Sequence, residues 1–150
     1  MKILIAADHA GLELKNKLAD TLRKEGHQVE DLGPFTEASV DYPDYADQVS
    51  RKLQTEENQA HLQEMGILVC GSGQGMALRA NKFFNIRAAL VYNDEIAKMA
   101  REHNNANIIC IGSRFTDYEA SLGWVHIFLK TPFAGGRHQT RVAKINASVS

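Results

Sequence analysis

The sequence is poor in the features that mark several large classes of protein. Its 150 residues include only two cysteines, Cys70 and Cys110, and both fall in apolar segments, which suits a reducing cytoplasm better than a disulfide framework. Its formal net charge is −1, which argues against a nucleic-acid-binding surface. No apolar run is long enough to span a membrane, and the chain enters a strand pattern at once, so we expect no signal peptide. We therefore expect one cytoplasmic domain over residues 1–150.

The common phosphate-binding and metal-binding motifs are missing as well. Lys82 lies too far from the glycine-rich segment for a G-x-x-x-x-G-K-[ST] loop. The G-x-G-x-G run lacks the third glycine position of the dinucleotide fingerprint, and Met76 stands where a cysteine phosphatase loop has arginine. No His, Cys and Asp cluster has the spacing of metal ligands, so we expect neither a metal nor another cofactor.

Short apolar runs alternate with amphipathic segments along the whole chain. The apolar runs predict strands, and the segments with helical spacing predict helices between them. This order predicts an α/β protein with a doubly wound, five-stranded parallel sheet of the Rossmann-like kind and helices on both faces. The expected strands are Lys2–Ala7, Gln28–Leu32, Gly66–Cys70, Ile86–Val91 and Asn107–Ile111, and the expected helices are Leu12–Lys24, Tyr45–Leu53 with Pro43 at its start, Met76–Phe83, Glu95–Glu102, Asp117–Leu129 and Arg137–Ile145.

The segment from Ile67 to Lys82 is the most informative part of the sequence. A strand, a glycine-rich turn and a helix in this order present backbone N–H groups where an anion can bind. Cys70 ends the strand, at the sheet edge where open α/β folds bind ligands, and a thiol beside N–H donors can serve as a base or a nucleophile. The alternative is that Cys70 is a small buried hydrophobe. Three glycines in five residues favour a site, because they allow close approach of the backbone.

Three polar or aromatic residues are further candidates, each with a structural alternative. Asp8 and His9 follow the first strand at the same sheet edge, although Asp8 is also a typical helix cap and His9 a typical surface loop residue. Tyr42 precedes the Pro43 helix start, where it either points into a site or packs against the core.

A set of short motifs resembles one known family. The motifs are A-x-D-H-A-G, D-Y-P-D-Y-A, C-G-S-G-x-G-M, A-N-K, R-A-A-L, A-R-x-H-N-x-A-N, G-x-R and G-G-R-H-x-x-R, and they occur in family order from Ile3 to about Ile145. Together they resemble ribose-5-phosphate isomerase type B, the family that also contains the galactose-6-phosphate isomerase subunits. The resemblance implies metal-independent interconversion of ribose 5-phosphate and ribulose 5-phosphate through an enediolate.

The resemblance also implies roles for individual residues. Cys70 is the implied base that moves a proton between C1 and C2, and His103 is the implied acid that opens the furanose ring. Backbone donors in the glycine loop and the Asn81 amide suit the growing oxyanion, and arginines suit a phosphate dianion, although each arginine alone reads as a solvated surface residue. The expected substrate-binding residues are Asp8, His9, Tyr42, Gly71, Ser72, Gly73, Gly75, Asn81 and Asn104, and the expected phosphate-binding residues are His9, Arg114, Arg137 and Arg141.

The direction of the strands predicts the assembly. Cys70 ends the third strand, whereas the helix after the fourth strand runs back and carries His103 about 13 Å away, to the opposite edge of the sheet. If both residues serve one site, the histidine comes from a second chain. We therefore expect a homodimer with shared active sites, with a tetramer as a larger assembly.

Three residues depart from the family pattern. Gln74 stands where the family usually has an apolar residue, Arg79 where it has a small one, and Asn105 where it has an aspartate. We expect Arg79 to face out of its helix or to alter the surroundings of the glycine loop. If the missing aspartate orients His103 in the family, Asn105 weakens the ring-opening assignment.

Two alternative functions are consistent with the sequence. One is isomerisation of another sugar phosphate, with six carbons or a deoxy sugar, since loop 33–44 and Tyr42 would shape that choice. The other is a non-catalytic sugar-phosphate-binding module on the same fold. Retention of Cys70, His103 and the arginines together favours the enzyme.

Overall fold

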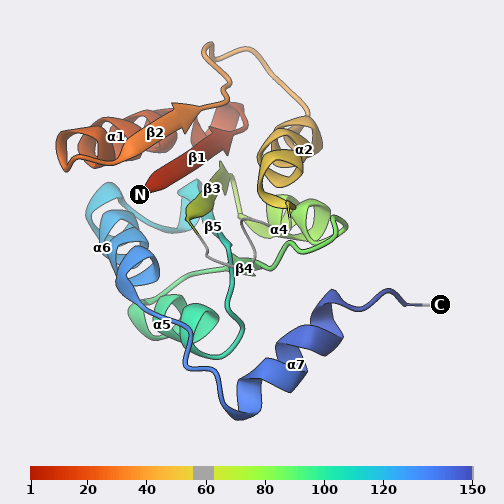
Figure 1. Cartoon of the computed structure of the whole chain (residues 1–150). Helices are drawn as coiled ribbons and strands as arrows, with labels where there is room; N and C mark the ends of the chain where they lie inside the picture. The colour runs from red at the N-terminus through yellow and green to blue at the C-terminus, as the bar shows by residue number, and fades with distance from the viewer. Residues whose placement is uncertain (56–62, 150) are drawn as a thin grey trace.

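The computed structural model describes residues 1–55 and 63–149 and has the expected doubly wound α/β architecture. One five-stranded sheet has the strand order β2-β1-β3-β5-β4, and every neighbouring pair is parallel. Figure 1 shows this sheet between two groups of helices. The strands are β1 (Lys2–Ala7), β2 (Gln28–Asp31), β3 (Glu64–Cys70), β4 (Ala88–Leu90) and β5 (Ile108–Gly112). The helices are α1 (Leu12–Lys24), α2 (Tyr42–Leu53), α4 (Gln74–Ala80), α5 (Asp94–Glu102), α6 (Tyr118–Lys130) and α7 (Arg137–Asn146), with short 3-10 turns η1 (His9–Gly11) and η2 (Ser113–Phe115).

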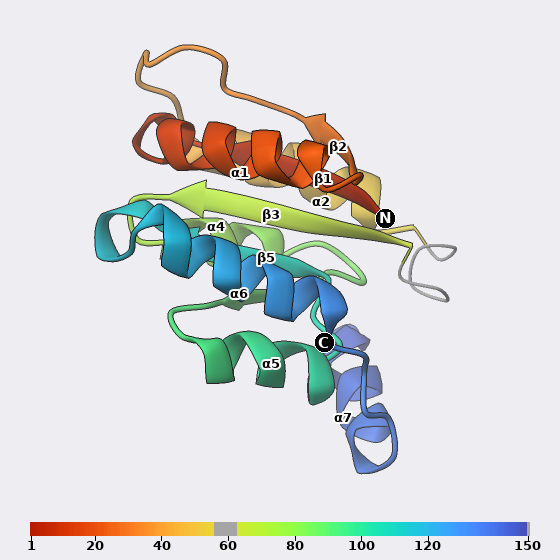
Figure 2. The same ribbon diagram turned by 90° about the vertical axis from the view of Figure 1, so that its left-hand side faces the viewer.

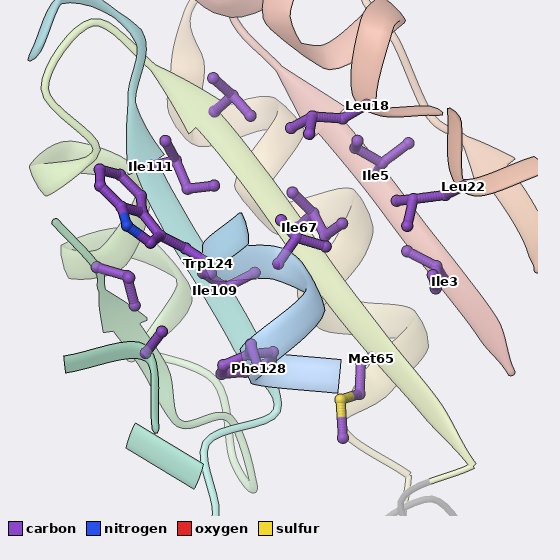
Figure 3. Packing of buried hydrophobic residues seen from close by; sticks show 14 of the residues in the cluster. Ile3, Ile5, Leu18, Leu22, Met65, Ile67, Ile109, Ile111, Trp124 and Phe128 are labelled. Carbon is purple, nitrogen blue, oxygen red and sulfur yellow. The ribbon is translucent and has the colours of Figure 1, made fainter. Parts of the chain in front are cut away.

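Each face of the sheet is covered by its own helices. Successive side chains of a strand point to opposite faces, so strands buried on both sides are apolar throughout, as β3 is from Met65 to Cys70. Helices α1, α5 and α6 cover one face, and Figure 3 shows Trp124 and Phe128 of α6 directed onto the isoleucines of β3 and β5. Helices α2 and α4 cover the other face through Ala46, Val49, Met76, Ala77 and Ala80.

Several elements end at different residues from those expected, for local reasons. The fourth strand starts at Ala88 instead of Ile86, because the Ile86 N–H donates to the Phe83 carbonyl and the Arg87 N–H donates to the Asn107 side chain. Helix α4 starts earlier and ends sooner than expected, at Gln74 and Ala80. Helix α2 begins at Tyr42, so this residue lies in the first helical turn with Pro43.

The connections after β1 and β3 diverge at the carboxyl edge of the sheet, and we use the word crevice for the place between the ends of these two strands. The loop after β1 leads to α1 on one face, and the loop after β3 leads to α4 on the other face. Open α/β sheets bind ligands where neighbouring connections diverge in this way. The backbone N–H of Asp8 donates to the Val69 carbonyl at 3.0 Å, which holds the end of β1 beside the end of β3.

A buried ion pair fixes the loop that leads from β2 to α2. Lys15 of α1 is fully buried, and its ammonium donates to both Asp31 carboxylate oxygens at 2.7 and 2.8 Å and to the Pro34 carbonyl at 2.9 Å. Further along, the Val40 N–H donates to His9 Nδ1 at 3.2 Å. The loop is therefore attached to the carboxyl edge of the sheet at two points before it reaches Tyr42.

Helix α7 is separate from the layered body. It buries only His138 and Val142, and both views show it apart from the sheet, beyond the end of α5 (Figures 1 and 2). In Figure 2 the arrowhead of β3 and helix α7 lie at opposite ends of the view. Among the helices of the described residues, none combines the length and the apolar character needed to cross a membrane.

Candidate active site

The Cys70 thiol lies at the carboxyl end of β3, under the glycine loop. It is 5% exposed, and its sulfur accepts the Gly73 N–H at 3.1 Å. Gly73 has a φ of +76°, and a Cβ there would meet Leu90 and the backbone of Ile111 and Gly112. Glycine tolerates this positive φ and has no Cβ to collide with these neighbours, so the loop can direct the Gly73 N–H at the sulfur. Such a donor stabilises negative charge on the sulfur.

The second cysteine provides a contrast on the neighbouring strand. Cys110 of β5 belongs to the same apolar cluster as Cys70 but is fully buried. Burial raises the pKa of the Cys110 thiol, and the nearby Cys70 raises it further. A thiol in this environment stays protonated and unreactive. Of the two cysteines, Cys70 is therefore the candidate for a base or a nucleophile.

Asp8 and His9 border the crevice from the β1 side. The Asp8 carboxylate is 7% exposed and accepts the Gly11 N–H at 3.0 Å, so its expected alternative as a turn cap is confirmed. A Cβ at Gly11 would collide with the Val69 carbonyl, which shows how closely η1 approaches β3. Asp8 and His9 therefore lie beside the end of the strand that carries Cys70.

Tyr42 and Arg114 contact the glycine loop from two other elements. A Cβ at Gly75 would lie 2.5 to 2.8 Å from the ring and hydroxyl atoms of Tyr42, so this glycine makes room for the tyrosine. The Arg114 guanidinium of η2 lies 3.1 Å from the place of a Cβ at Gly71, and the Arg114 N–H donates to the Gly71 carbonyl. The carboxyl edge of one chain thus collects a thiol, a carboxylate, a phenol and an exposed guanidinium.

His103 and the last two arginines form a separate group at the end of α5 and on α7. His103 is the C-terminal cap of α5, and its ring stacks on His138 with 4.3 Å between ring centroids and 12° between planes. Burial lowers the pKa of His138, and so do His103, Arg137 and Arg141 around it. Arg137 and Arg141 are exposed and one helical turn apart on α7. The sequence did not single out His138, because the stack joins two helices 35 positions apart in the chain (138 minus 103).

The two groups lie at opposite edges of the sheet. The segment after His103 enters β5 through Asn107, whose carbonyl accepts the Gly66 N–H at 2.9 Å. Gly66 and Cys70 are four residues apart in β3, and a strand rises by about 3.3 Å per residue, so the two edges are about 13 Å apart. One chain therefore does not place His103 beside its own Cys70. This confirms the reasoning from strand direction.

Asn81 lies away from the glycine loop of its own chain. Its side-chain amide donates to the Ala88 carbonyl at 2.9 Å, and its side-chain oxygen accepts the Ala88 N–H at 2.8 Å. Asn81 thus joins the end of α4 to the start of β4, at the edge of the sheet opposite Cys70. Both hydrogen-bonding groups of the amide are occupied, which favours a structural role, and its expected contact with substrate stays a prediction.

Two of the residues that depart from the family pattern, Asn105 and Arg79, bind other side chains, and Arg79 faces out of its own helix as expected. The Asn105 side-chain oxygen accepts a hydrogen bond from Arg101 at 2.9 Å, and His103 is oriented by His138 instead. The side chain of Arg79 leaves its helix toward α2, where it binds Asp47. Both side chains are thus engaged away from Cys70 and the His103 ring, so the departures from the family pattern do not remove the candidate acid or base.

Two pockets flank the end of β5 and its following turn. One of about 270 Å³ is lined by Ala10, Ser113, Arg114 and the first turns of α1 and α6. The other, of about 210 Å³, is mostly apolar and lies between the glycine loop and Trp124. Within the described residues, no group of three His, Cys, Asp or Glu side chains is arranged to hold a metal ion.

Comparison with known proteins identifies the family. The family model described as Ribose/Galactose Isomerase matches residues 3–145. A Mycoplasma genitalium protein named probable ribose-5-phosphate isomerase B is 42% identical, over 95% of this chain and 92% of that protein. A crystal structure of a Thermotoga maritima ribose 5-phosphate isomerase has 46% identity and a TM-score of 0.90, and the match covers 97% of each chain. A Mycoplasma genitalium ribose-5-phosphate isomerase B with bound ribulose-5-phosphate has 41% identity and a TM-score of 0.89 and covers 97% of this chain and 93% of that one. The Rossmann-like architecture and the motif order thus agree with the family match, and the chain belongs to the Ribose/Galactose Isomerase family.

Proposed function

We propose that this protein interconverts ribose 5-phosphate and ribulose 5-phosphate as an aldose–ketose isomerase. The observation that carries the proposal is the Cys70 sulfur, which receives a backbone N–H at the crevice between β1 and β3. The structure of the Mycoplasma genitalium relative with bound ribulose-5-phosphate supports this choice of substrate.

Cys70 acts as the base in this proposal. Its thiolate removes the proton from C2 of the open-chain aldose and returns it to C1, while the hydroxyl proton passes from O2 to O1, so that no redox partner is needed. The enediolate that forms between these steps carries negative charge on oxygen. In this proposal the backbone N–H groups of the 71–75 loop other than that of Gly73, which donates to the sulfur, stabilise that charge, and the reaction needs no metal ion.

Substrate recognition divides between the two edges of the sheet. We propose that Asp8, His9, Tyr42 and Arg114, which lie at the carboxyl edge that carries Cys70, contact the substrate there. His103 and Asn104 at the end of α5, with Arg137 and Arg141 on α7, lie about 13 Å away in the same chain, estimated from the rise along β3. We propose that they complete the crevice of a second copy, where His103 opens the sugar ring and the arginines bind the phosphate. The working unit is then a homodimer with two shared sites, and a tetramer would pair two such dimers.

The test uses the two cysteines as a matched pair. Cys70→Ala should reduce isomerisation of ribose 5-phosphate at least 1,000-fold, which is of the order of the loss of an essential base. Cys110→Ala should keep activity within about threefold, because this thiol is buried and protonated. A coupled assay over a panel of aldose phosphates, with five and six carbons and with deoxy sugars, identifies the preferred substrate. Full activity of Cys70→Ala would disprove the assignment of the base, and inactivity of the wild type on the whole panel would favour a binding module.

The same assay tests the other parts of the proposal. Treatment with a chelator should leave the rate unchanged, and loss of activity with recovery on adding a divalent ion would contradict a metal-independent reaction. Two free thiols suit a reducing compartment, so we place the reaction in the cytoplasm.

A further inference from the structure

Helices α2 and α4 run side by side, and a bidentate ion pair joins them. Arg79 Nε donates to Asp47 Oδ1 at 2.5 Å, and a terminal nitrogen of the same guanidinium donates to Asp47 Oδ2 at 2.8 Å. This two-point arrangement fixes orientation as well as distance. The Asp47 side chain is 16% exposed, so the carboxylate lies largely within the contact between the helices.

The ion pair lies one helical turn from the contact between Tyr42 and the glycine loop. Tyr42 is five residues before Asp47 on α2, and Gly75 is four residues before Arg79 on α4. Both helices run from the carboxyl edge of the sheet toward its other edge. The two contacts are therefore successive points along the same pair of parallel helices, about 6 to 8 Å apart at 1.5 Å per residue.

The buried contact between these helices combines short and larger apolar side chains: Ala46 on α2 and Ala77 and Ala80 on α4 are short, whereas Val49 and Leu53 on α2 and Met76 on α4 are larger. Apolar contact has no fixed direction, whereas the two hydrogen bonds between Arg79 and Asp47 fix the orientation of one helix against the other. A displacement of α2 along its axis would strain this pair and would move the Tyr42 ring relative to Gly75.

Two further groups surround the ion pair without joining the helices in the same way. The Arg79 guanidinium lies 5.6 Å from the centroid of the Phe83 ring, and the Arg51 guanidinium lies 5.7 Å from it. Arg51 also approaches Asp47 at 3.4 Å, but both residues belong to α2. Arg51 is therefore a suitable control for Arg79. It has the same charge as Arg79 and also lies beside Phe83, but its ion pair with Asp47 lies within α2 and cannot fix α2 against α4.

We propose that Arg79, through Asp47, is a positioning residue that holds Tyr42 against the glycine loop and so sets the shape of the sugar site. This inference rests on the proposed function, in which Tyr42 contacts the substrate. Arg79 itself does not touch the substrate in this proposal.

The test is a double-mutant cycle between Arg79 and Tyr42, measured with the sugar phosphate that the wild type isomerises. Arg79→Met keeps apolar contact with Phe83 but removes the ion pair, and it should raise KM about three- to tenfold with a smaller change in kcat. Tyr42→Ala should raise KM at least as much. In the Tyr42→Ala background, Arg79→Met should have no further effect, because its action passes through Tyr42. Arg79→Lys, with one hydrogen bond in place of two, should recover part of the loss, and Arg51→Met should leave both constants unchanged.

A second measurement separates this inference from the proposed function. With 13C in the tyrosine rings, the Tyr42 resonance is assigned as the one that disappears in Tyr42→Phe. It should shift in Arg79→Met and not in Arg51→Met, whether or not the protein is an isomerase. A shift in a protein without isomerase activity would uphold the positioning role and reject the proposed function. An unshifted resonance, or full additivity in the cycle, would overturn the positioning role even in an active enzyme.

Discussion

Asn105 brings two buried arginines together beside the His103 cap. Its backbone carbonyl accepts a hydrogen bond from Arg87 Nε at 2.9 Å, and its side-chain oxygen accepts one from Arg101 at 2.9 Å. The pKa of each guanidinium group is lowered to about 10, by burial in both cases and, for Arg87, also by the nearby charge of Arg101. Both remain cations at neutral pH, so a neutral amide oxygen lies at a position where a carboxylate would bind more strongly.

We therefore predict that Asn105→Asp stabilises the protein. Asparagine and aspartate both tolerate the φ of 47° at this position, so the backbone need not change. The free energy of unfolding should rise by about 1 to 2 kcal/mol, which is the usual gain when a hydrogen bond becomes charge-assisted. Urea denaturation at neutral pH measures this change. Asn104→Asp, at the exposed neighbouring position, is the control and should change the stability by less than about 0.5 kcal/mol.

The stability gained by Asn105→Asp should depend on pH. In the Asn105→Asp variant, the two guanidinium groups should hold the pKa of the introduced carboxyl group below its unfolded value of about 3.9. The unfolded state then binds more protons in acid, so the added stability is complete above about pH 5 and is lost as the pH falls through the folded-state pKa. A gain that is unchanged at pH 2, or equal to the gain in the control, would contradict an electrostatic origin.

At the scale of elements, hydrophobic periodicity predicted the strands and helices because burial on two faces dominates their sequences. Helix α1 begins and ends where the leucine spacing places it, at Leu12 and Lys24. The fourth strand was predicted too long, because Ile86 and Arg87 continue its pattern in the sequence but donate their N–H groups to a turn and to a side chain. Periodicity reports burial and carries no information about such local partners.

Contacts between distant elements were beyond the reach of sequence patterns. The buried pair of Lys15 and Asp31 and the stack of His103 on His138 depend on how helices are placed in space. Sequence patterns supplied the candidates near the ends of the first and third strands, the resemblance to a family supplied the others, and strand direction supplied the distance between Cys70 and His103. None of these could show that Arg79 reaches Asp47, since a charged residue on a helix usually faces solvent.

We propose that helix α7 serves the active site of another chain. Its Arg137 and Arg141 are exposed on one side of the helix, and they lie far from the crevice of their own chain. We predict that Arg137→Ala or Arg141→Ala raises KM for ribose 5-phosphate at least tenfold. Inhibition by inorganic phosphate should weaken in parallel, because a forked guanidinium binds the phosphate group itself.

Lys144 provides the control on the same helix. It is exposed and lies in the last turn of α7, so Lys144→Ala should leave KM and phosphate inhibition unchanged. Binding of free ribose should be equally weak in all three variants and the wild type, as calorimetry can show. If the arginine variants weaken free ribose and ribose 5-phosphate to the same extent, these arginines do not bind the phosphate.

At the scale of the whole molecule, the distance between Cys70 and His103 within one chain bears on how many chains form one active site. In the proposed dimer, each of the two crevices takes Cys70 from one chain and His103 from the other. A mixture of Cys70→Ala and His103→Ala protomers, each inactive alone, should then regain activity after subunit exchange. In a mixed dimer one crevice collects both substitutions and the other is intact. Random exchange makes about half of the dimers mixed, so about a quarter of the wild-type activity should return.

A second mixture shows which chain supplies each residue. Arg114 contacts the glycine loop of its own chain, beside Cys70. In a mixed dimer of Cys70→Ala and Arg114→Ala protomers, each crevice therefore keeps one substitution, and activity should stay at the level of the two parents. Mass spectrometry of protomers with different isotope labels verifies that exchange has occurred. Recovery in the first mixture and not in the second would place His103 across the dimer from Cys70 and Arg114 on the same side. Verified exchange without recovery in the first mixture would mean that His103 does not complete the crevice of a partner.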